Sequence, residues 1–177
     1  MQNIFLGMLF AFLDFDISLG NRTIGLLPDF VGYLLMIKGL EEMAAESALF
    51  EKARPWAVGM AVYTGVLYAM AFLAMPVQLR LLNWVMGVAA LVAGLVISRW
   101  ILQGILEIEA KRRIQLQAFQ LEQLWKPLAI IQLVVAVFGW FPLIGWICAL
   151  AAFVMSVCYL VAFRKTKNLY FDYIGLR

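Results

Sequence analysis

Five polar residues stand close together near the amino terminus of a strongly apolar sequence, and they are Asp14, Asp16, Asn21, Arg22 and Asp29. Three carboxylates against one guanidinium leave the group net negative, a charge that suits a cation or an amine rather than an anion. Side chains two residues apart on a helix point about 200° from each other, so Asp14 and Asp16 are not expected to face the same partner. We expect these five residues to form a binding site for a small ligand or ion.

Carboxylates can also act as a general acid and a general base. An intramembrane enzyme that uses Asp14 or Asp16 together with Asp29 is therefore an alternative, and it is the least favoured one. The sequence contains no histidine, which removes the commonest general base, the usual transition-metal ligand and any Ser-His or Cys-His pair. A glycine-rich phosphate loop and a Cys-x-x-Cys motif are also missing from it. We therefore expect no enzyme activity, no catalytic residue, no metal site and no cofactor.

Structural roles compete with a functional one at two of these positions. Asp29 follows Pro28, and a Pro-Asp pair in the first turn of a helix complements the helix dipole without any further role. Arg22 can neutralise an aspartate as a structural ion pair. A charged group deep in a membrane costs about 3 kcal/mol or more unless it is paired or hydrated. Asp14, Arg22 and Asp29 are therefore expected to approach one another near the outer end of the first helical hairpin.

The composition places these residues in a membrane protein. Of the 177 residues, 65% are apolar and 14% are charged, whereas soluble domains carry roughly 25% charged residues. The mean hydropathy is +0.91, so the excess apolar surface must face lipid. The length allows about six spans of roughly 20 residues each. The first apolar run lacks the basic start and small-residue end of a cleavable signal, which predicts a retained first helix.

The apolar blocks indicate how the spans are arranged. Residues 127–163 contain no charge, and a helix of that length would measure about 55 Å. A bilayer core is about 30 Å thick, so this block must fold as a hairpin that turns at Gly139-Trp-Phe-Pro142. The block at 55–98 is also almost free of charge, with Arg80 as its single charged residue, and it is expected to turn near Pro76. The predicted fold is all-α, a single polytopic membrane domain over residues 1–177 with six transmembrane helices. Its three helical hairpins are expected at 1–45, 55–103 and 118–164, with a cytoplasmic tail at 165–177.

The first hairpin has two interpretations, because the apolar run at 4–13 is too short to span a bilayer alone. Either two full helices over residues 1–19 and 24–43 carry polar outer halves, or two half-helices form a re-entrant pair. The lengths of the two segments favour two full spans. Two further expectations concern packing inside the spans. The small residues between Gly87 and Gly94 predict a close approach of the fourth helix to a neighbour, and polar residues such as Tyr63, Thr64 and Gln132 predict interhelical hydrogen bonds.

The basic residues predict the orientation. Of the 14 Lys and Arg residues, only Arg22 and Arg80 fall at hairpin tips. The others lie on the side that holds both termini, and basic residues flanking membrane helices remain in the cytoplasm. We therefore expect both termini to be cytoplasmic. Because the basic residues flank apolar segments and form no continuous stripe, nucleic acid is not an expected partner.

A short motif resembles that of a known family. The sequence Pro28-Asp-Phe-Val-Gly-Tyr33, with Gly39-Leu40 after it, is similar to the Pro-Asp-Phe-x-Gly-Tyr signature of a family of small polytopic membrane proteins of Gram-positive bacteria. The resemblance covers about the first third of the chain. It implies a bacterial plasma membrane and carries no activity with it.

The architecture also resembles that of the substrate-binding components of energy-coupling-factor transporters. The likeness rests on six helices, a small size and two cytoplasmic ends. Those components carry spaced alanines on their first helix, and Ala11 alone does not reproduce them. Likeness of architecture does not imply likeness of function.

The sequence therefore predicts an integral membrane protein without catalytic activity. It is expected either to partner another membrane protein or to bind a small ligand or ion through the first hairpin. A membrane subunit of a small-molecule or cation transporter is the alternative. The lipid bilayer is its expected surrounding, and association with a second copy stays open.

Overall fold

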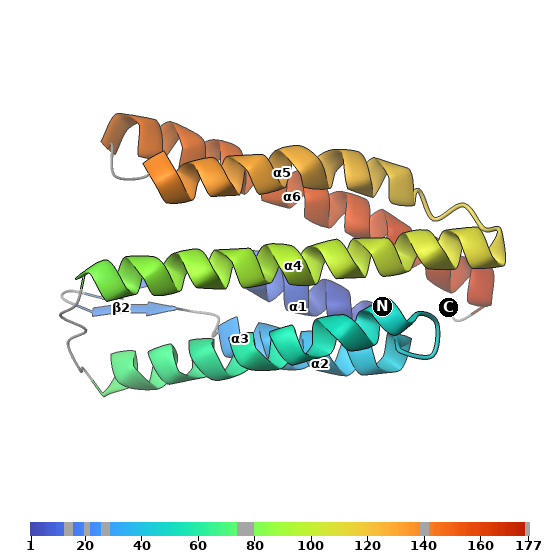
Figure 1. Ribbon diagram of the computed structural model, residues 1–177, viewed down its shortest axis with the longest axis horizontal. Helices are drawn as coiled ribbons and strands as arrows, with labels where there is room; N and C mark the ends of the chain where they lie inside the picture. The colour runs from blue at the N-terminus through green and yellow to red at the C-terminus, as the bar shows by residue number, and fades with distance from the viewer. Residues whose placement is uncertain (13–15, 20–21, 26–28, 74–79, 139–141, 176–177) are drawn as a thin grey trace.

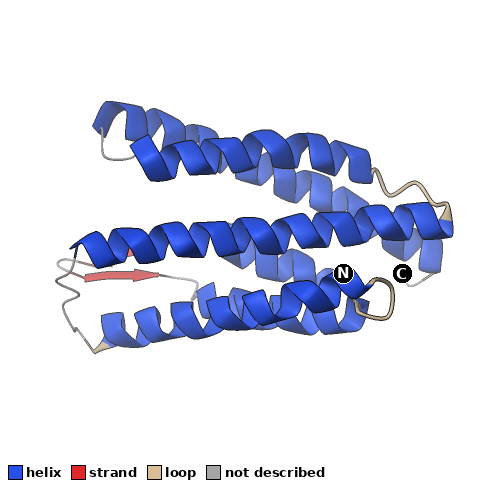
Figure 2. Cartoon of the chain, in the orientation of Figure 1, coloured by secondary structure: helices blue, strands red, loops and turns tan. Residues whose placement is uncertain are grey.

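The computed structural model describes the chain apart from residues 13–15, 20–21, 26–28, 74–79, 139–141 and 176–177. Side chains are described outside 13–28, 71–72, 74–83, 138–145 and 176–177. The described chain forms six helices and one two-stranded hairpin (Figures 1 and 2). In chain order these are α1 (Gln2–Phe12), β1 (Asp16–Leu19), β2 (Arg22–Gly25), α2 (Asp29–Met43), α3 (Ala48–Phe72), α4 (Arg80–Arg112), α5 (Ala118–Phe138) and α6 (Pro142–Ile174).

The six helices close into a ring. Each helix packs against the next one along the chain, and α1 packs against α6. All six lie along the long axis of the molecule, and both termini lie at the same end (Figure 1). The connections at 44–47 and 113–117 also lie at that end, which we call the terminal end. The predicted six-helix bundle is confirmed, and the β1–β2 hairpin is a feature that was not predicted.

The first hairpin differs from both interpretations of its sequence. The helices expected over 1–19 and 24–43 are shorter, because α1 has 11 residues and α2 has 15. At about 1.5 Å per residue they measure about 16 and 22 Å. Between them, β1 and β2 pair antiparallel, with Asp16 opposite Gly25 and Leu19 opposite Arg22. The β-branched residues Ile17 and Ile24 favour strand over helix here.

Glycines allow α1 and α2 to approach each other closely. A Cβ atom added at Gly7 would stand 2.6 Å from the carbonyl oxygen of Gly32, and one added at Gly39 would stand 2.5 Å from the backbone nitrogen of Ile4. Only glycine fits at such contacts, as in other closely packed helix pairs. At Gly87 and Gly94 the close approach expected for α4 is not found, because a Cβ at either position would meet nothing within 4 Å.

Tight packing is concentrated toward the terminal end. Fully buried side chains there come from the second halves of α2 and α4 and the first half of α3, among them Leu40, Phe50, Ile101 and Ile105. Phe163 joins them from α6, where it is also fully buried. The segment expected as a separate tail from residue 165 continues this helix to Ile174. The terminal end is therefore a continuous apolar core.

The α5–α6 pair contacts the rest of the ring less extensively than its two helices contact each other. Along α1 and α6, Phe5 stacks on Phe163 with ring centroids 6.4 Å apart, and Phe12 meets Tyr159 edge to face at 6.1 Å. Such aromatic pairs contribute about 0.5–1.5 kcal/mol each beyond the area they bury. These rings form one of the two boundaries between α5–α6 and the other four helices.

Polar groups hold the second boundary, between α4 and α5. Trp125 Nε1 donates a hydrogen bond to Ser98 Oγ at 2.9 Å, and the Arg99 guanidinium lies 5.0 Å from the centre of the Trp125 ring. Arg99 also pairs with Glu122 at 3.5 Å. A cation over an aromatic ring adds about 0.5–1 kcal/mol at a partly exposed site.

Within the part of the chain that the structure describes, two helices are long and apolar enough to cross a membrane, by length and composition alone. They are Trp84–Arg112 of α4 and Trp146–Ile174 of α6, with mean hydropathies of 2.1 and 2.3. Only 28% and 22% of their most apolar windows are buried inside the protein. The core helix of a soluble protein would be mostly buried, so these two helices expose apolar surface that an ordinary soluble fold would cover.

Candidate functional site

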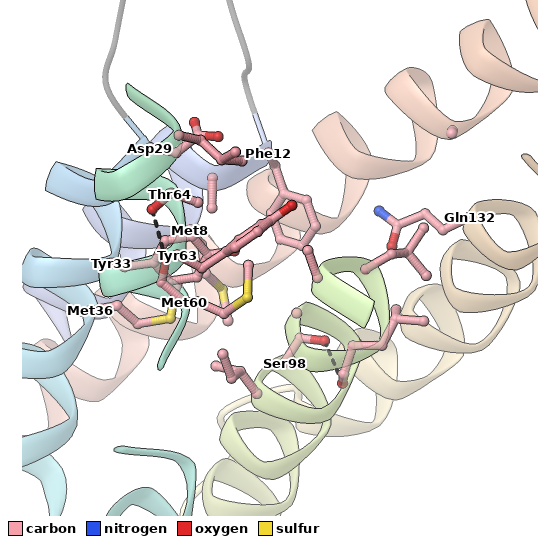
Figure 3. A pocket seen from close by; sticks show the side chains of 18 of the residues that line it. Met8, Phe12, Asp29, Tyr33, Met36, Met60, Tyr63, Thr64, Ser98 and Gln132 are labelled. Atoms are coloured by element: carbon pink, nitrogen blue, oxygen red, sulfur yellow. Dashed lines mark hydrogen bonds between the residues drawn. The ribbon is translucent and has the colours of Figure 1, made fainter. Parts of the chain in front are cut away.

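A cavity of about 450 Å³ lies inside the ring, and side chains from all six helices line it (Figure 3). Most of the lining is apolar. Its polar side chains are Asp29 and Tyr33 from α2, Tyr63 and Thr64 from α3, Ser98 from α4 and Gln132 from α5. A largely apolar cavity of this size with a few convergent polar groups is typical of a small-molecule site.

One face of α2 supplies the charged group. Asp29, Tyr33 and Met36 are spaced by four and three residues, so they lie on the same side of the helix and all line the cavity. Asp29 is the first residue of α2 and Phe12 the last of α1. Figure 3 shows these two residues together at one end of the cavity. Asp29 as a whole is half-buried and its Oδ1 atom is buried, so at least one carboxylate oxygen is shielded from solvent.

The adjoining face of α2 holds it against α1. Gly32 and Gly39 are seven residues apart, so they share a face, and both contact α1. The signature residues of the first hairpin therefore divide into two groups. Gly32 and Gly39 set the distance between the helices, while Asp29 and Tyr33 line the cavity.

Hydroxyl groups on α3 and α4 donate within their own helices. Thr64 Oγ1 donates to the carbonyl of Met60 at 2.8 Å, and Ser98 Oγ donates to the carbonyl of Leu95 at 2.9 Å. Ser98 Oγ also accepts the bond from Trp125 on α5, whereas the bonds of Thr64 to other described residues stay within α3. With its proton donated, the Thr64 oxygen can act toward a ligand as an acceptor.

Methionines and aromatic rings form much of the apolar wall. Met8, Met36 and Met60 come from three different helices, and the lining aromatic residues are Phe12, Tyr33 and Tyr63. Methionine side chains are flexible and polarisable, so they adapt to ligands of different shape. Gly94 also lines the cavity, and the lack of a side chain there enlarges it.

The cavity is closed toward the terminal end and begins at the opposite end of α1 and α2. Met36, Met60 and Ile97 lie at its inner limit and are all buried. Beyond them lies the continuous apolar core around Leu40 and Phe50. A ligand would therefore enter from the side of the bundle or from the end near Asp29.

Of the five predicted site residues, Asp29 is the one whose side chain the structure describes, and it lines the cavity. Asp14 and Asn21 lie outside the described residues. Asp16 begins β1 and Arg22 begins β2. Their register places them at opposite ends of the hairpin, three residues or about 10 Å apart along a strand. Because their side chains are not described, the expected approach of Asp14, Arg22 and Asp29 stays a prediction.

Sequence reasoning missed the cavity role of Tyr33, Tyr63 and Gln132. Polar residues at similar depth on several apolar helices were a usable signal. Tyr63 and Gln132 were instead assigned to hydrogen bonds between helices, and Tyr33 was identified only as part of the motif that follows Pro28. Figure 3 shows Gln132 reaching in from α5, across from the α2 and α3 side chains. Among the described residues, no group of three or more His, Cys, Asp or Glu side chains is placed to hold a metal ion.

No family model, curated protein or solved structure matches this chain.

Proposed function

We propose that this chain is an integral membrane protein that binds a small ligand in the cavity at the centre of its helical ring. The single observation that carries the proposal is the cavity of about 450 Å³ lined by all six helices, with one carboxylate at one end. A tightly packed protein rarely keeps so large a space empty of function, because interiors pack to the density of organic crystals. Ligand binding without catalysis matches the side chains that line it.

The membrane assignment rests on the outer surface of the bundle. Trp146 on α6 is 80% exposed. Other large apolar side chains are exposed around the outside, including Val62 and Val66 on α3, Val85 and Val92 on α4, Leu133 and Val137 on α5, and Leu150 and Phe153 on α6. Exposed apolar side chains on four helices favour contact with lipid over contact with water.

The proposed topology has six passes in a bacterial plasma membrane, with both termini in the cytoplasm. α4 and α6 are long enough to cross alone, whereas α1 and α2 reach the outer face only together with the β1–β2 hairpin. Basic residues at the terminal end, such as Arg54, Arg112 and Lys167, support a cytoplasmic position for that end. The motif around Pro28 supports a bacterial membrane by resemblance alone.

Transport is the second candidate, and the difference between the two ends of the cavity favours it. The terminal end is sealed by the apolar core and held by polar contacts. Arg112 binds both carboxylate oxygens of Glu46, at 2.6 and 3.0 Å, and Lys167 donates to Gln2 at 2.6 Å. A carrier must alternate such a sealed end with an open one. Binding is the simpler function and needs only the arrangement already described.

Thermal unfolding in detergent tests the binding proposal. The probes are 4-phenylbutylamine, 4-phenylbutanol and 4-phenylbutyrate, which share one skeleton. A probe that binds the folded protein raises its melting temperature. In Gly94→Leu the new side chain would occupy the cavity, since a Cβ there meets nothing within 4 Å. Gly87→Leu is the matched control, because Gly87 is equally unobstructed and is not among the lining residues.

We expect at least one probe to stabilise the wild-type protein and the Gly87→Leu variant. The same probe should lose its effect on Gly94→Leu. Stabilisation that persists unchanged in Gly94→Leu would mean that the probe binds elsewhere. If no probe stabilises the wild-type protein, the proposed function is wrong for ligands of this size.

A further inference from the structure

We infer that the ligand of this cavity is an amphipathic cation, with its positive group beside Asp29 and its apolar body among the methionines and aromatic rings. The inference rests on the proposed function and specifies the chemistry of the ligand. It can fail while the cavity still binds something else.

The first reason is charge. Among the described residues that line the cavity, Asp29 is the only charged one, and it stands at one end. A carboxylate attracts a cation within a few ångströms, and the attraction is stronger in a largely apolar space than in water. An anion would be repelled at the same place. A neutral ligand would gain nothing from the charge.

The second reason is the kind of side chain around the carboxylate. Phe12 and Asp29 line the same end of the cavity (Figure 3). Tyr33 follows Asp29 by one helical turn, and Tyr63 lines the cavity from α3. Aromatic rings stabilise a nearby cation through their negative faces, and they do so for ammonium groups that cannot donate a hydrogen bond. A carboxylate with several rings is a common arrangement for binding amines.

The third reason is the division of the cavity along its length. The charged group is at one end, and the other end is formed by apolar side chains such as Met36, Met60 and Ile97. A ligand that satisfies both ends must be charged at one end and apolar at the other. Inorganic cations satisfy only the first requirement, since the few oxygens here come from widely spaced residues and Ca²⁺ or Mg²⁺ needs six or more oxygen ligands.

Isothermal titration with the same three probes at pH 7 tests the inference. At this pH the amine is a cation, the alcohol is neutral and the acid is an anion. For the wild-type protein we expect the amine to bind about tenfold or more tightly than the alcohol, and the acid to bind least tightly. The quaternary analogue 4-phenylbutyltrimethylammonium should keep most of the affinity of the amine, because charge and aromatic contact do not require an N–H group.

Asp29→Asn is the decisive variant, with Asp172→Asn as its matched control. Asparagine keeps the size of the side chain and its ability to accept hydrogen bonds in the first turn of α2, so the variant is expected to fold. Asp172 is exposed near the end of α6, away from the cavity. We expect Asp29→Asn to weaken amine binding about tenfold or more and to leave alcohol binding within about twofold. Asp172→Asn should change neither.

The outcomes separate the two proposals. If the three probes bind the wild-type protein equally, or if the acid binds best, the cationic inference is overturned and the cavity proposal stands. If Asp29→Asn binds the amine as well as the wild-type protein does, the inference is likewise overturned. If no probe binds and Gly94→Leu behaves as Gly87→Leu does, the proposed function itself fails. Should Asp29→Asn not fold, the order of the three affinities in the wild-type protein still decides the inference.

Discussion

Gly32 on α2 and Phe10 on α1 lie so close that a Cβ atom added at Gly32 would stand 2.6 Å from the Phe10 Cβ. Cβ atoms do not approach to that distance, so any larger residue at 32 would push the helices apart. Tyr33 and Asp29 on the same helix line the cavity. The contact between Gly32 and Phe10 therefore fixes where the carboxylate stands relative to α1.

Gly32→Ala is expected to destabilise the protein by about 1–3 kcal/mol, the usual cost of forcing an extra methyl group into a packed contact. Gly59→Ala is the control, because a Cβ at Gly59 meets nothing within 4 Å. Removing a glycine from the interior of α3 should stabilise the protein by up to about 1 kcal/mol. Unfolding in a denaturing detergent measures both variants. If Gly32→Ala and Gly59→Ala were equally stable, α1 and α2 could move apart without a loss of folding free energy.

Ser47→Ala is expected to cost about 1–2 kcal/mol, because the hydroxyl makes two contacts. Its oxygen accepts a hydrogen bond from the Leu49 amide at 3.2 Å, which caps α3, and its proton is donated to Glu107 at 2.5 Å. Ser47 itself is only 4% exposed. The same unfolding measurement should show a smaller loss for Arg54→Ala, about 0–1 kcal/mol, since the ion pair of Arg54 with Glu41 is exposed. A larger loss for Arg54→Ala would contradict this account.

Arg22→Ala is expected to lower the melting temperature in detergent more than Arg80→Ala does. The physical reason is that Arg22 is the basic residue nearest in sequence to the three aspartates, so its loss would leave a carboxylate uncompensated. The side chains of both arginines lie outside the part of the chain that the structure describes. Equal melting temperatures would mean that the aspartates are solvated. That outcome would itself favour a cavity that accepts cations.

Cysteine labelling in intact cells tests the topology. The native Cys148 and Cys158 are first replaced, because Cys158 is exposed on the described surface. A reagent that does not cross membranes should label cysteines introduced near Arg22 or Arg80. It should not label those introduced at Glu46 or Lys167 until the cells are permeabilised. Labelling from outside near residues 111–113 would reverse the proposed orientation.

The helical bundle could be predicted from the sequence because apolar blocks and their interruptions are local properties. Two apolar blocks identify pairs of helices without any knowledge of their packing: 55–98, whose single charged residue is Arg80, and 127–163, which has no charged residue. The first hairpin could not be predicted in the same way. Its polar segment carries both helix-compatible and strand-compatible residues, and the pairing of Asp16 with Gly25 depends on the position of the helices on either side.

The cavity could not be predicted, because it depends on how each helix is rotated about its axis. Asp29 could be identified because a charged side chain in an apolar setting has a high free-energy cost, and that cost can be recognised from one residue alone. Tyr63 and Gln132 are 69 residues apart and line the same space. Their meeting follows from the closure of the ring by α1 and α6, and no spacing in the sequence encodes that closure.

The uneven packing of the ring determines how the molecule can move. α4 and α6 contain 33 residues each, so each helix is about 50 Å long. That length exceeds the thickness of a bilayer core by about 20 Å. Ile101, Ile105 and Phe163 hold the two helices in the apolar core of the terminal end. We therefore expect a ligand that widens the cavity to separate α5–α6 from the other helices at the end away from the termini, with the terminal end serving as the pivot.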